Sequence, residues 1–473
     1  MNLATQTAVK DAGTARGATW ISARLLLLFS ALIVMIVMLF SRADSDHAVP
    51  AVGALLVAAA ATGMALLRPM VVGDLDRLRR AEQALVVSLL LAGLILTARM
   101  LARAFAELAS PLWLTMTSVY TILGLAAAGL LVRRLPQLKW AFPVFLVTHA
   151  CIAVALLRSA PPQIDVAVFL HDGAVAVLHG HNPYSMTFPS IYAQPLSDLF
   201  YGHGVVMNGR ITYGFPYLPL SLLAAIPGQM LGDVRFSQLI AMLVTAVALR
   251  RLASDRIGRA AAVLGVAAPA AIPMLTGAWT EPALVALLAC LVLALARRRY
   301  TFVAVFLGLF LVSKQYVVVV IPVVWLIRQW LTRRVIFIGV SVAAVVTLAF
   351  FMVDPAAFWK AIVQYQLIQP FRADSVSLLV SSVNTFSWPP PWTYGVLPLV
   401  GGGLTAVALA LRAPRTPAAF AAAVGLTLLV TILLSKQAFM NYYYLVSGAF
   451  LIAAVAWPTQ PESTQPESSN PSA

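Results

Sequence analysis

Residues 417–435 read PAAFAAAVGLTLLVTILLS, a continuous stretch without a single charged side chain. A helix of about 20 apolar residues crosses the hydrocarbon core of a bilayer, so this stretch predicts a membrane-spanning helix. The whole chain has the same character, because 61% of its 473 residues are hydrophobic and only 10% are charged. Its apolar runs are too long and continuous for barrel strands, and open strands cannot satisfy their backbone groups in lipid. We therefore expect an all-α polytopic membrane protein.

Fourteen segments have the length and composition of spanning helices. They are residues 21–40, 49–67, 83–101, 112–132, 140–157, 236–250, 260–276, 281–297, 300–314, 316–328, 335–353, 393–412, 417–435 and 440–457. A polar N-terminal segment, residues 1–20, precedes them. Residues 458–473 form a low-complexity tail that holds too little apolar surface to fold, so we expect it to be disordered.

The positive charge falls in short loops at regular intervals along the chain. With the N-terminus in the cytoplasm, the inner loops hold most of the 32 Lys and Arg residues, as the positive-inside rule requires. This pattern accounts for the net charge of +15 without a nucleic-acid partner. It predicts a cell-membrane protein with both termini in the cytoplasm and two long outer loops, residues 158–235 and 354–392.

One apolar stretch inside the first outer loop is left out of the fourteen. Counting residues 215–231 as a span would place the arginine cluster of residues 250–259 on the outer side. Pro216, Pro219 and Pro227 also disfavour a straight spanning helix. We expect an interfacial or re-entrant helix on the outer face.

A polar cluster opens the first outer loop. Its members are Asp165, His171, Asp172, His179, His181, Asn182 and Tyr184. Charged groups in so apolar a chain call for a functional explanation. Asp165 follows shortly after a predicted span and precedes an apolar helical run, so we expect it at the membrane surface. Asp172 is the other carboxylate of this cluster that could act as a base in its place. A metal site built from these histidines and an aspartate is the less favoured interpretation, since no His-x-x-x-His spacing occurs.

Other outer turns supply charges and aromatic groups. These are Arg210, Tyr213, Tyr217, Glu281, Lys314, Arg372, Lys436, Asn441 and Tyr442. A carboxylate near cations suits a reaction in which a hydroxyl is deprotonated while a phosphate departs. Structural interpretations stand beside this one: Lys314 and Lys436 can be interfacial lysines, and Glu281 can complement a helix dipole.

These segments resemble a family of membrane enzymes. Residues 164–165 (ID), an apolar helix and residues 178–184 (LHGHNPY) are similar to the first outer loop of GT-C superfamily glycosyltransferases, and closest to the polyprenol-phosphate-mannose-dependent enzymes of glycosyltransferase family 87. The Lys314 segment and residues 215–220 (FPYLPL), 369–375 (QPFRADS) and 436–442 (KQAFMNY) extend the likeness over about residues 140–457. Three features depart from the family: Leu218 replaces a proline, Glu281 matches the second acid only loosely, and four extra spans, within residues 21–139, precede the GT-C-like domain.

The resemblance implies an inverting transferase that uses a polyprenyl-phosphate sugar donor, with the catalytic base falling on Asp165. Mannose is the sugar that the resemblance favours, while arabinose, glucose and galactose remain open. For the donor phosphate we expect Lys314, Arg372, Lys436 and Arg210. For the sugar hydroxyls or a secondary acid role we expect Asp172, His171, Glu281, His181, Asn182 and Tyr184. For the acceptor or lipid groove we expect Tyr213, Tyr217, Asn441 and Tyr442.

The expected partners are the lipid-linked donor, a lipid or glycan acceptor, and membrane lipids. No cofactor is expected, because lysine and arginine can supply the positive charge that a divalent metal would bring. Two other classes of function remain: a transporter or lipid flippase of a cell-envelope pathway, and a non-catalytic membrane subunit. The near absence of charge from the middles of the spans argues against transport, since transporters place polar sites near the midplane.

Overall fold

The computed structural model describes residues 22–38, 45–67, 75–107, 118–126, 140–159, 161–162, 164–387 and 395–458. Within these ranges nearly all regular structure is helical, which confirms the predicted all-α class. The predicted N-terminal segment 1–20, the tail beyond residue 458 and much of the predicted span 112–132 lie outside the described residues.

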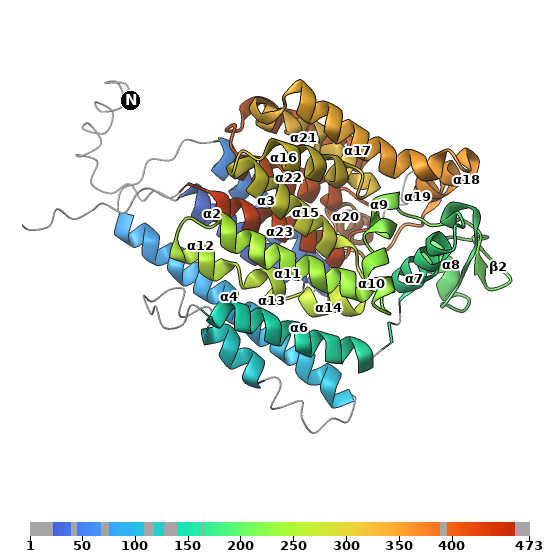
Figure 1. Cartoon of the computed structure of the whole chain (residues 1–473), viewed down its shortest axis with the longest axis horizontal. Coiled ribbons are helices and arrows are strands. Elements are labelled where there is room, and N and C mark those ends of the chain that lie inside the picture. Colours follow the sequence, from blue (N-terminus) through green and yellow to red (C-terminus); the bar gives the residue numbers. More distant parts are fainter. Residues whose placement is uncertain are drawn as a thin grey trace, which may run out of the picture.

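The N-terminal helices are packed onto the rest of the chain (Figure 1). They are α2 (Ala23–Val37), α3 (Ser45–Leu67), α4 (Leu75–Glu107), a helix at residues 118–126, and α6 (Ala141–Ser159). Helix α2 begins at Ser22, whose hydroxyl accepts the Leu25 N–H at 2.9 Å as an N-cap. It lies against both α3 and the last helix, α23 (Met440–Ala456), so the two ends of the sequence share one hydrophobic core.

The remaining long helices form the body of the bundle. They are α11 (Arg235–Leu252), α15 (Glu281–Ala296), α16 (Tyr300–Leu311), the 3₁₀ helix η5 (Gln315–Trp330), α17 (Arg333–Phe351), α21 (Leu397–Arg412) and α22 (Pro417–Leu433). Helix α22 is apolar on all sides and almost wholly buried, as expected for a helix at the centre of a bundle. Helices α16 and α17 touch through Gly308 and Gly339, where a side chain at either position would meet the opposite backbone.

One predicted span is not a continuous helix. Residues 256–276 form three short helices, α12 (Arg256–Ala261), α13 (Leu264–Ala267) and α14 (Ala271–Thr276). Ala268 is extended, with ψ of 146°, because a residue that precedes a proline avoids the helical region. The expectation of one continuous helix over residues 260–276 is therefore wrong.

Several helices are long and apolar enough to cross a membrane, which supports a membrane protein. Among the described residues four pass this test: Ala48–Leu67, Asp76–Ala102, Ala141–Ser159 and Arg333–Phe351. A fifth is added if Pro219–Met230 and Arg235–Leu252, which are bent by 103° at their junction, count as one broken span. The other predicted spans that lie in described parts of the chain are shorter or broken helices, so fourteen crossings are not confirmed.

The two long predicted loops come together as one structure at one end of the bundle (Figure 1). We call this structure the cap and define it as residues 164–230 and 354–368. Its elements are α7 (Asp165–Leu178), η4 (Pro183–Ser185), β1 (Phe188–Pro189), α8 (Leu196–Tyr201), β2 (Val206–Met207), β3 (Arg210–Ile211), α9 (Pro219–Leu223), α10 (Ile226–Met230), α18 (Pro355–Trp359), the π-helical turn η6 (Lys360–Gln364) and α19 (Tyr365–Ile368). A further helix, α20 (Leu378–Phe386), follows.

The cap has a hydrophobic core of its own, separate from that of the bundle. Its strands form a small antiparallel sheet in the order β1-β3-β2, in which Ile211 pairs with both Phe188 and Val206. The hairpin between β2 and β3 turns at Asn208 and Gly209, which both have positive φ, as this tight turn requires. The interfacial helix expected at residues 215–231 is present as two short helices, α9 and α10, rather than one.

Candidate functional site

Asp165 is the first residue of α7, directly after the extended residue Ile164. Its Oδ1 accepts the N–H of Val166 at 2.9 Å, and a carboxylate at a helix N-terminus complements the helix dipole. The side chain is partly exposed, so it remains accessible from outside the cap core. The structure thus places an approachable carboxylate at the junction of the cap and the bundle.

The surroundings of Asp165 tune its affinity for a proton. Burial raises the pKa of this carboxyl above the ordinary value of 3.8. The Tyr201 hydroxyl, the Val166 N–H and the positive charge of Arg372 act in the opposite direction. Because the net shift is upward, Asp165 binds a proton more tightly than an ordinary aspartate does, as a general base must.

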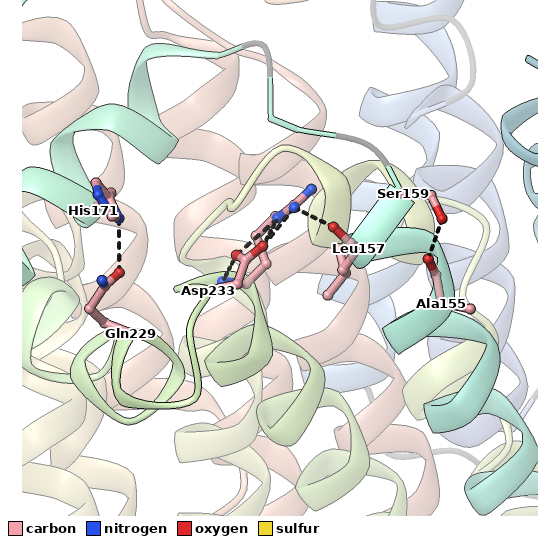
Figure 2. A network of polar contacts seen from close by, with 7 residues as sticks. Ala155, Leu157, Ser159, His171, Gln229 and Asp233 are labelled. Atoms are coloured by element: carbon pink, nitrogen blue, oxygen red, sulfur yellow. Dashed lines mark hydrogen bonds and ion pairs between the residues drawn. The ribbon is translucent and has the colours of Figure 1, made fainter. Parts of the chain in front are cut away.

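One polar contact joins the flank of α7 to its neighbour α10, and a second group of contacts lies close by (Figure 2). His171 lies 2.9 Å from the side-chain oxygen of Gln229 on α10. Nearby, Arg235 at the start of α11 is buried, binds Asp233 at 2.6 Å and donates to the Leu157 carbonyl of α6 at 2.7 Å. The first contact joins α7 to α10, and the others join the start of α11 to the end of α6.

Arg372 is the cation whose charge acts on Asp165. Its guanidinium makes a two-point contact with Asp374, at 2.8 and 2.7 Å, and lies 4.3 Å from the ring centre of Phe200 and 4.8 Å from that of Phe439. The backbone N–H of Arg372 donates to the Lys436 carbonyl at 3.1 Å. Asp374 is largely exposed, so the guanidinium is held in a fixed orientation beside a carboxylate that can move into solvent.

Lys436 is engaged with the backbone instead of a carboxylate. Its Nζ donates to the carbonyls of Leu367 at 3.1 Å and Gln369 at 2.5 Å, and burial lowers its pKa. Gln437 adds a bond to the Pro370 carbonyl at 3.0 Å. The loop before α23 is therefore fastened to the end of the cap and to the segment that carries Arg372.

Lys314 and Glu281 form a buried ion pair. Lys314 lies at the break between α16 and η5, Glu281 at the start of α15, and the Nζ and Oε1 atoms are 2.7 Å apart. Asn441, in the first turn of α23, donates to the same oxygen at 2.9 Å, and the Tyr316 hydroxyl lies 3.3 Å from it. Glu281 is 0% exposed and Lys314 only 4% exposed, so this lysine is already neutralised away from solvent.

Tyr217 connects the ion pair with Asp165. Its ring centre lies 4.7 Å from the Lys314 Nζ. Burial raises the pKa of the Tyr217 hydroxyl, and the negative charge of Asp165 is the next largest cause, ahead of Tyr442 and Glu281. The charges of both Asp165 and Glu281 therefore act on Tyr217, which indicates that Asp165 and the Lys314–Glu281 ion pair belong to one region.

The other expected sugar contacts lie along the cap. Asp172 is half-buried on the same face of α7 as Asp165, two turns further along. The Asn182 side chain caps η4 by accepting the Tyr184 N–H at 3.1 Å, and His181 is exposed beside it. Tyr184 is 2% exposed; it lies in the cap core and donates its hydroxyl to the Tyr217 carbonyl at 2.8 Å.

Two more expected residues occupy the cap. Arg210 bonds to Thr187 across the small sheet, at 2.7 and 2.6 Å, and no contact among the described residues connects it with Asp165. Tyr213 packs its ring on Tyr365, with centres 5.1 Å apart, while Lys360 lies 5.0 Å above the ring of Tyr213.

Two tyrosines beside Asp165 were not singled out from the sequence. Tyr201 closes α8 and Tyr365 opens α19, and the Asp165 charge raises the pKa of both, after burial. They come from segments more than 160 positions apart, so no local motif marks them as neighbours. Their placement depends on the cap core that joins the two loops.

Across the parts of the chain that the structure describes, no group of three or more His, Cys, Asp or Glu side chains is arranged to hold a metal ion. His171, His179 and His181, the residues weighed for a metal, make separate contacts instead. The described side chains can nonetheless accept a proton at Asp165 and offset negative charge at Arg372.

Comparisons of the chain with models of protein families, with curated proteins and with solved structures found no match.

Proposed function

We propose that the chain is an integral-membrane glycosyltransferase that transfers a sugar, mannose by preference, from a polyprenyl-phosphate donor to a lipid or glycan acceptor. The observation that supports it best is that the positive charge of Arg372 acts on the Asp165 carboxyl at the cap end of the bundle. A partly exposed carboxylate with a raised pKa lies there under the influence of an oriented guanidinium. Proton removal and stabilisation of a leaving phosphate require these two groups.

The proposed reaction is a single displacement at the anomeric carbon of the donor sugar. The acceptor oxygen forms a bond to that carbon while its proton passes to Asp165. The bond between the carbon and the phosphate oxygen breaks, and the phosphate departs with the electron pair, so the configuration inverts. Arg372 offsets the charge of the departing phosphate once its bond to the exposed Asp374 carboxylate is exchanged.

The membrane arrangement forms part of the same proposal. We place the cap on the extracytoplasmic side and both termini in the cytoplasm, with up to fourteen helical segments crossing or entering the membrane. The clustering of Lys and Arg in loops that would then be cytoplasmic supports this orientation. A lipid-linked phosphate would lie at the level of the helix ends, where Asp165 and Arg372 are found.

The test is a transfer assay with the purified chain in detergent or nanodiscs, using polyprenyl-phosphate mannose and a lipid acceptor extract. The parent protein should release polyprenyl phosphate and form a mannosylated product. Asp165→Asn should lower the rate by at least about 100-fold, because removing a general base costs roughly that factor. Asp172→Asn tests the rival base on the same face of α7. Asp198→Asn, at a carboxylate that contacts Gln194 and His203, is the matched control and should retain most of the rate.

Three outcomes would overturn the proposal. If the Asp165→Asn protein keeps the parent rate, Asp165 is not the general base. Loss of the rate in Asp172→Asn alone moves the base to that residue. A parent protein that carries the donor lipid across a vesicle membrane without transferring its sugar replaces the transferase with a flippase.

A further inference from the structure

Four side chains from three helix ends meet in a buried ionic group that we call the Lys314 knot. It consists of Lys314, Glu281, Asn441 and Tyr316, and the Glu281 Oε1 atom receives contacts from all three other residues. These residues come from the start of α15, the break between α16 and η5, and the first turn of α23. The knot therefore joins two consecutive helices to the start of α23, which is remote from them in sequence.

The surroundings of Lys314 make it a poor ligand for a substrate. Its Nζ atom binds Glu281 on one side and lies 4.7 Å from the ring centre of Tyr217 and 5.9 Å from that of Tyr316. A phosphate that captured this ammonium would leave the Glu281 carboxylate without its counter-ion in a place closed to water. Leaving a buried charge unpaired is strongly unfavourable, so the pair resists such an exchange.

We propose that Lys314 is a positioning residue and that the Lys314 knot orients the Tyr217 ring within the site that holds Asp165, instead of binding the donor phosphate as the sequence suggested. This inference rests on the proposed function, because it assigns a role within the same site. It leaves Arg372 as the main cation for the phosphate.

The position of Tyr217 depends on contacts on several sides. Lys314 holds its ring, and the Tyr184 hydroxyl binds its carbonyl at 2.8 Å. The preceding carbonyl, of Pro216, accepts from Gln315 at 2.9 Å and from the α19 residue Gln366 at 3.0 Å. The ring itself is contacted by Lys314 on one side and by the Phe215 ring, whose centre lies 5.6 Å away, on another. A disturbed knot removes the first of these contacts and leaves the Tyr217 hydroxyl less firmly oriented.

The experiment compares Lys314→Met, Glu281→Gln and the double variant. Glutamine keeps an oxygen for Asn441 and Tyr316, so the double variant removes both charges but preserves the acceptor. Lys314→Met alone strands the Glu281 carboxylate and should lower both the thermal midpoint and kcat, the latter by about 100-fold, as a misplaced group can. The double variant should regain most of both, because no charge is left unpaired and the methionine side chain still packs on the Tyr217 ring. Its donor KM should stay within about threefold of the parent, because no donor contact is lost. Lys360→Met, the loss of an exposed cap lysine, is the matched control.

A phosphate-binding Lys314 predicts a different pattern. The double variant would then keep the high donor KM of Lys314→Met even though its thermal midpoint recovers, and that result would overturn the inference. Equal midpoints for Lys314→Met and Lys360→Met would also overturn it, because the knot would then hold nothing. If the parent protein itself transfers no sugar, the proposed function fails, while the midpoints still report on the knot.

Tyr217 provides an independent check. Tyr217→Phe keeps the ring over Lys314, and Tyr217→Leu removes it. If the knot orients the ring, the leucine variant should lower kcat more than the phenylalanine variant, and combining it with Lys314→Met should add little further loss. Fully additive losses would contradict the coupling.

Discussion

Arg24 offers the strongest test of how the N-terminal helices are joined to the rest of the chain. Its guanidinium is 4% exposed and contacts both oxygens of Asp255, at 2.6 and 3.1 Å, with Glu82 of α4 3.7 Å away. Replacing Arg24 by methionine keeps the apolar part of the side chain and leaves two carboxylates without their cation. Breaking a buried ion pair costs roughly 3–5 kcal/mol, and the lower end applies here because the Asp255 side chain is 28% exposed.

We therefore expect Arg24→Met to lower the thermal midpoint by roughly 5 °C, measured by fluorescence of the purified protein in detergent. Arg80→Met, which removes an exposed arginine from α4, is the matched control and should change the midpoint little. Adding Asp255→Asn to Arg24→Met should recover part of the loss, since asparagine still caps α12 through the Gly258 N–H. Identical midpoints for Arg24→Met and Arg80→Met would refute the reasoning.

Two further predictions concern pH and helix packing. Transfer should be slow at acid pH and should rise as the pH passes upward through the pKa of Asp165, which lies above 3.8, because only the ionised carboxylate accepts a proton. A pH–rate profile that is already flat at the ordinary carboxyl pKa would contradict the assignment. Gly308→Ala should destabilise the protein by about 1–3 kcal/mol because its Cβ meets the Gly339 backbone. Gly63→Ala, where a Cβ meets no neighbour, should be neutral or stabilising, and a scan of thermal midpoints distinguishes the two.

The apolar runs of the sequence predicted where helices form but not how continuous they are. Residues 417–435 and 440–457 correspond closely to α22 and α23 because they contain no proline after the first turn. Residues 260–276 are equally apolar, yet Pro269 ends α13. The average hydropathy of a segment does not depend on whether one residue, such as Pro269, lacks a backbone N–H donor. The break in this helix was therefore not predicted.

In the site, too, the features set by neighbouring residues could be predicted, whereas those set by contacts between distant segments could not. The place of Asp165 at a helix start could be predicted, since a polar residue precedes an apolar helical run. The partnership of Lys314 with Glu281 could not, because both residues read separately as helix-end charges. The packing of α15 against α16 brings the two residues together. The charge of Lys314, which the sequence predicted to bind a phosphate, is therefore neutralised by Glu281.

The cap and the bundle have separate hydrophobic cores, with Trp279 packed against both. Substitutions inside the cap core can therefore accumulate without disturbing how the long helices pack. A lineage could remodel the cap while the core of the long helices stays as it is. For protein engineering this makes the cap the natural unit to exchange between related chains, with Trp279 as the residue to keep.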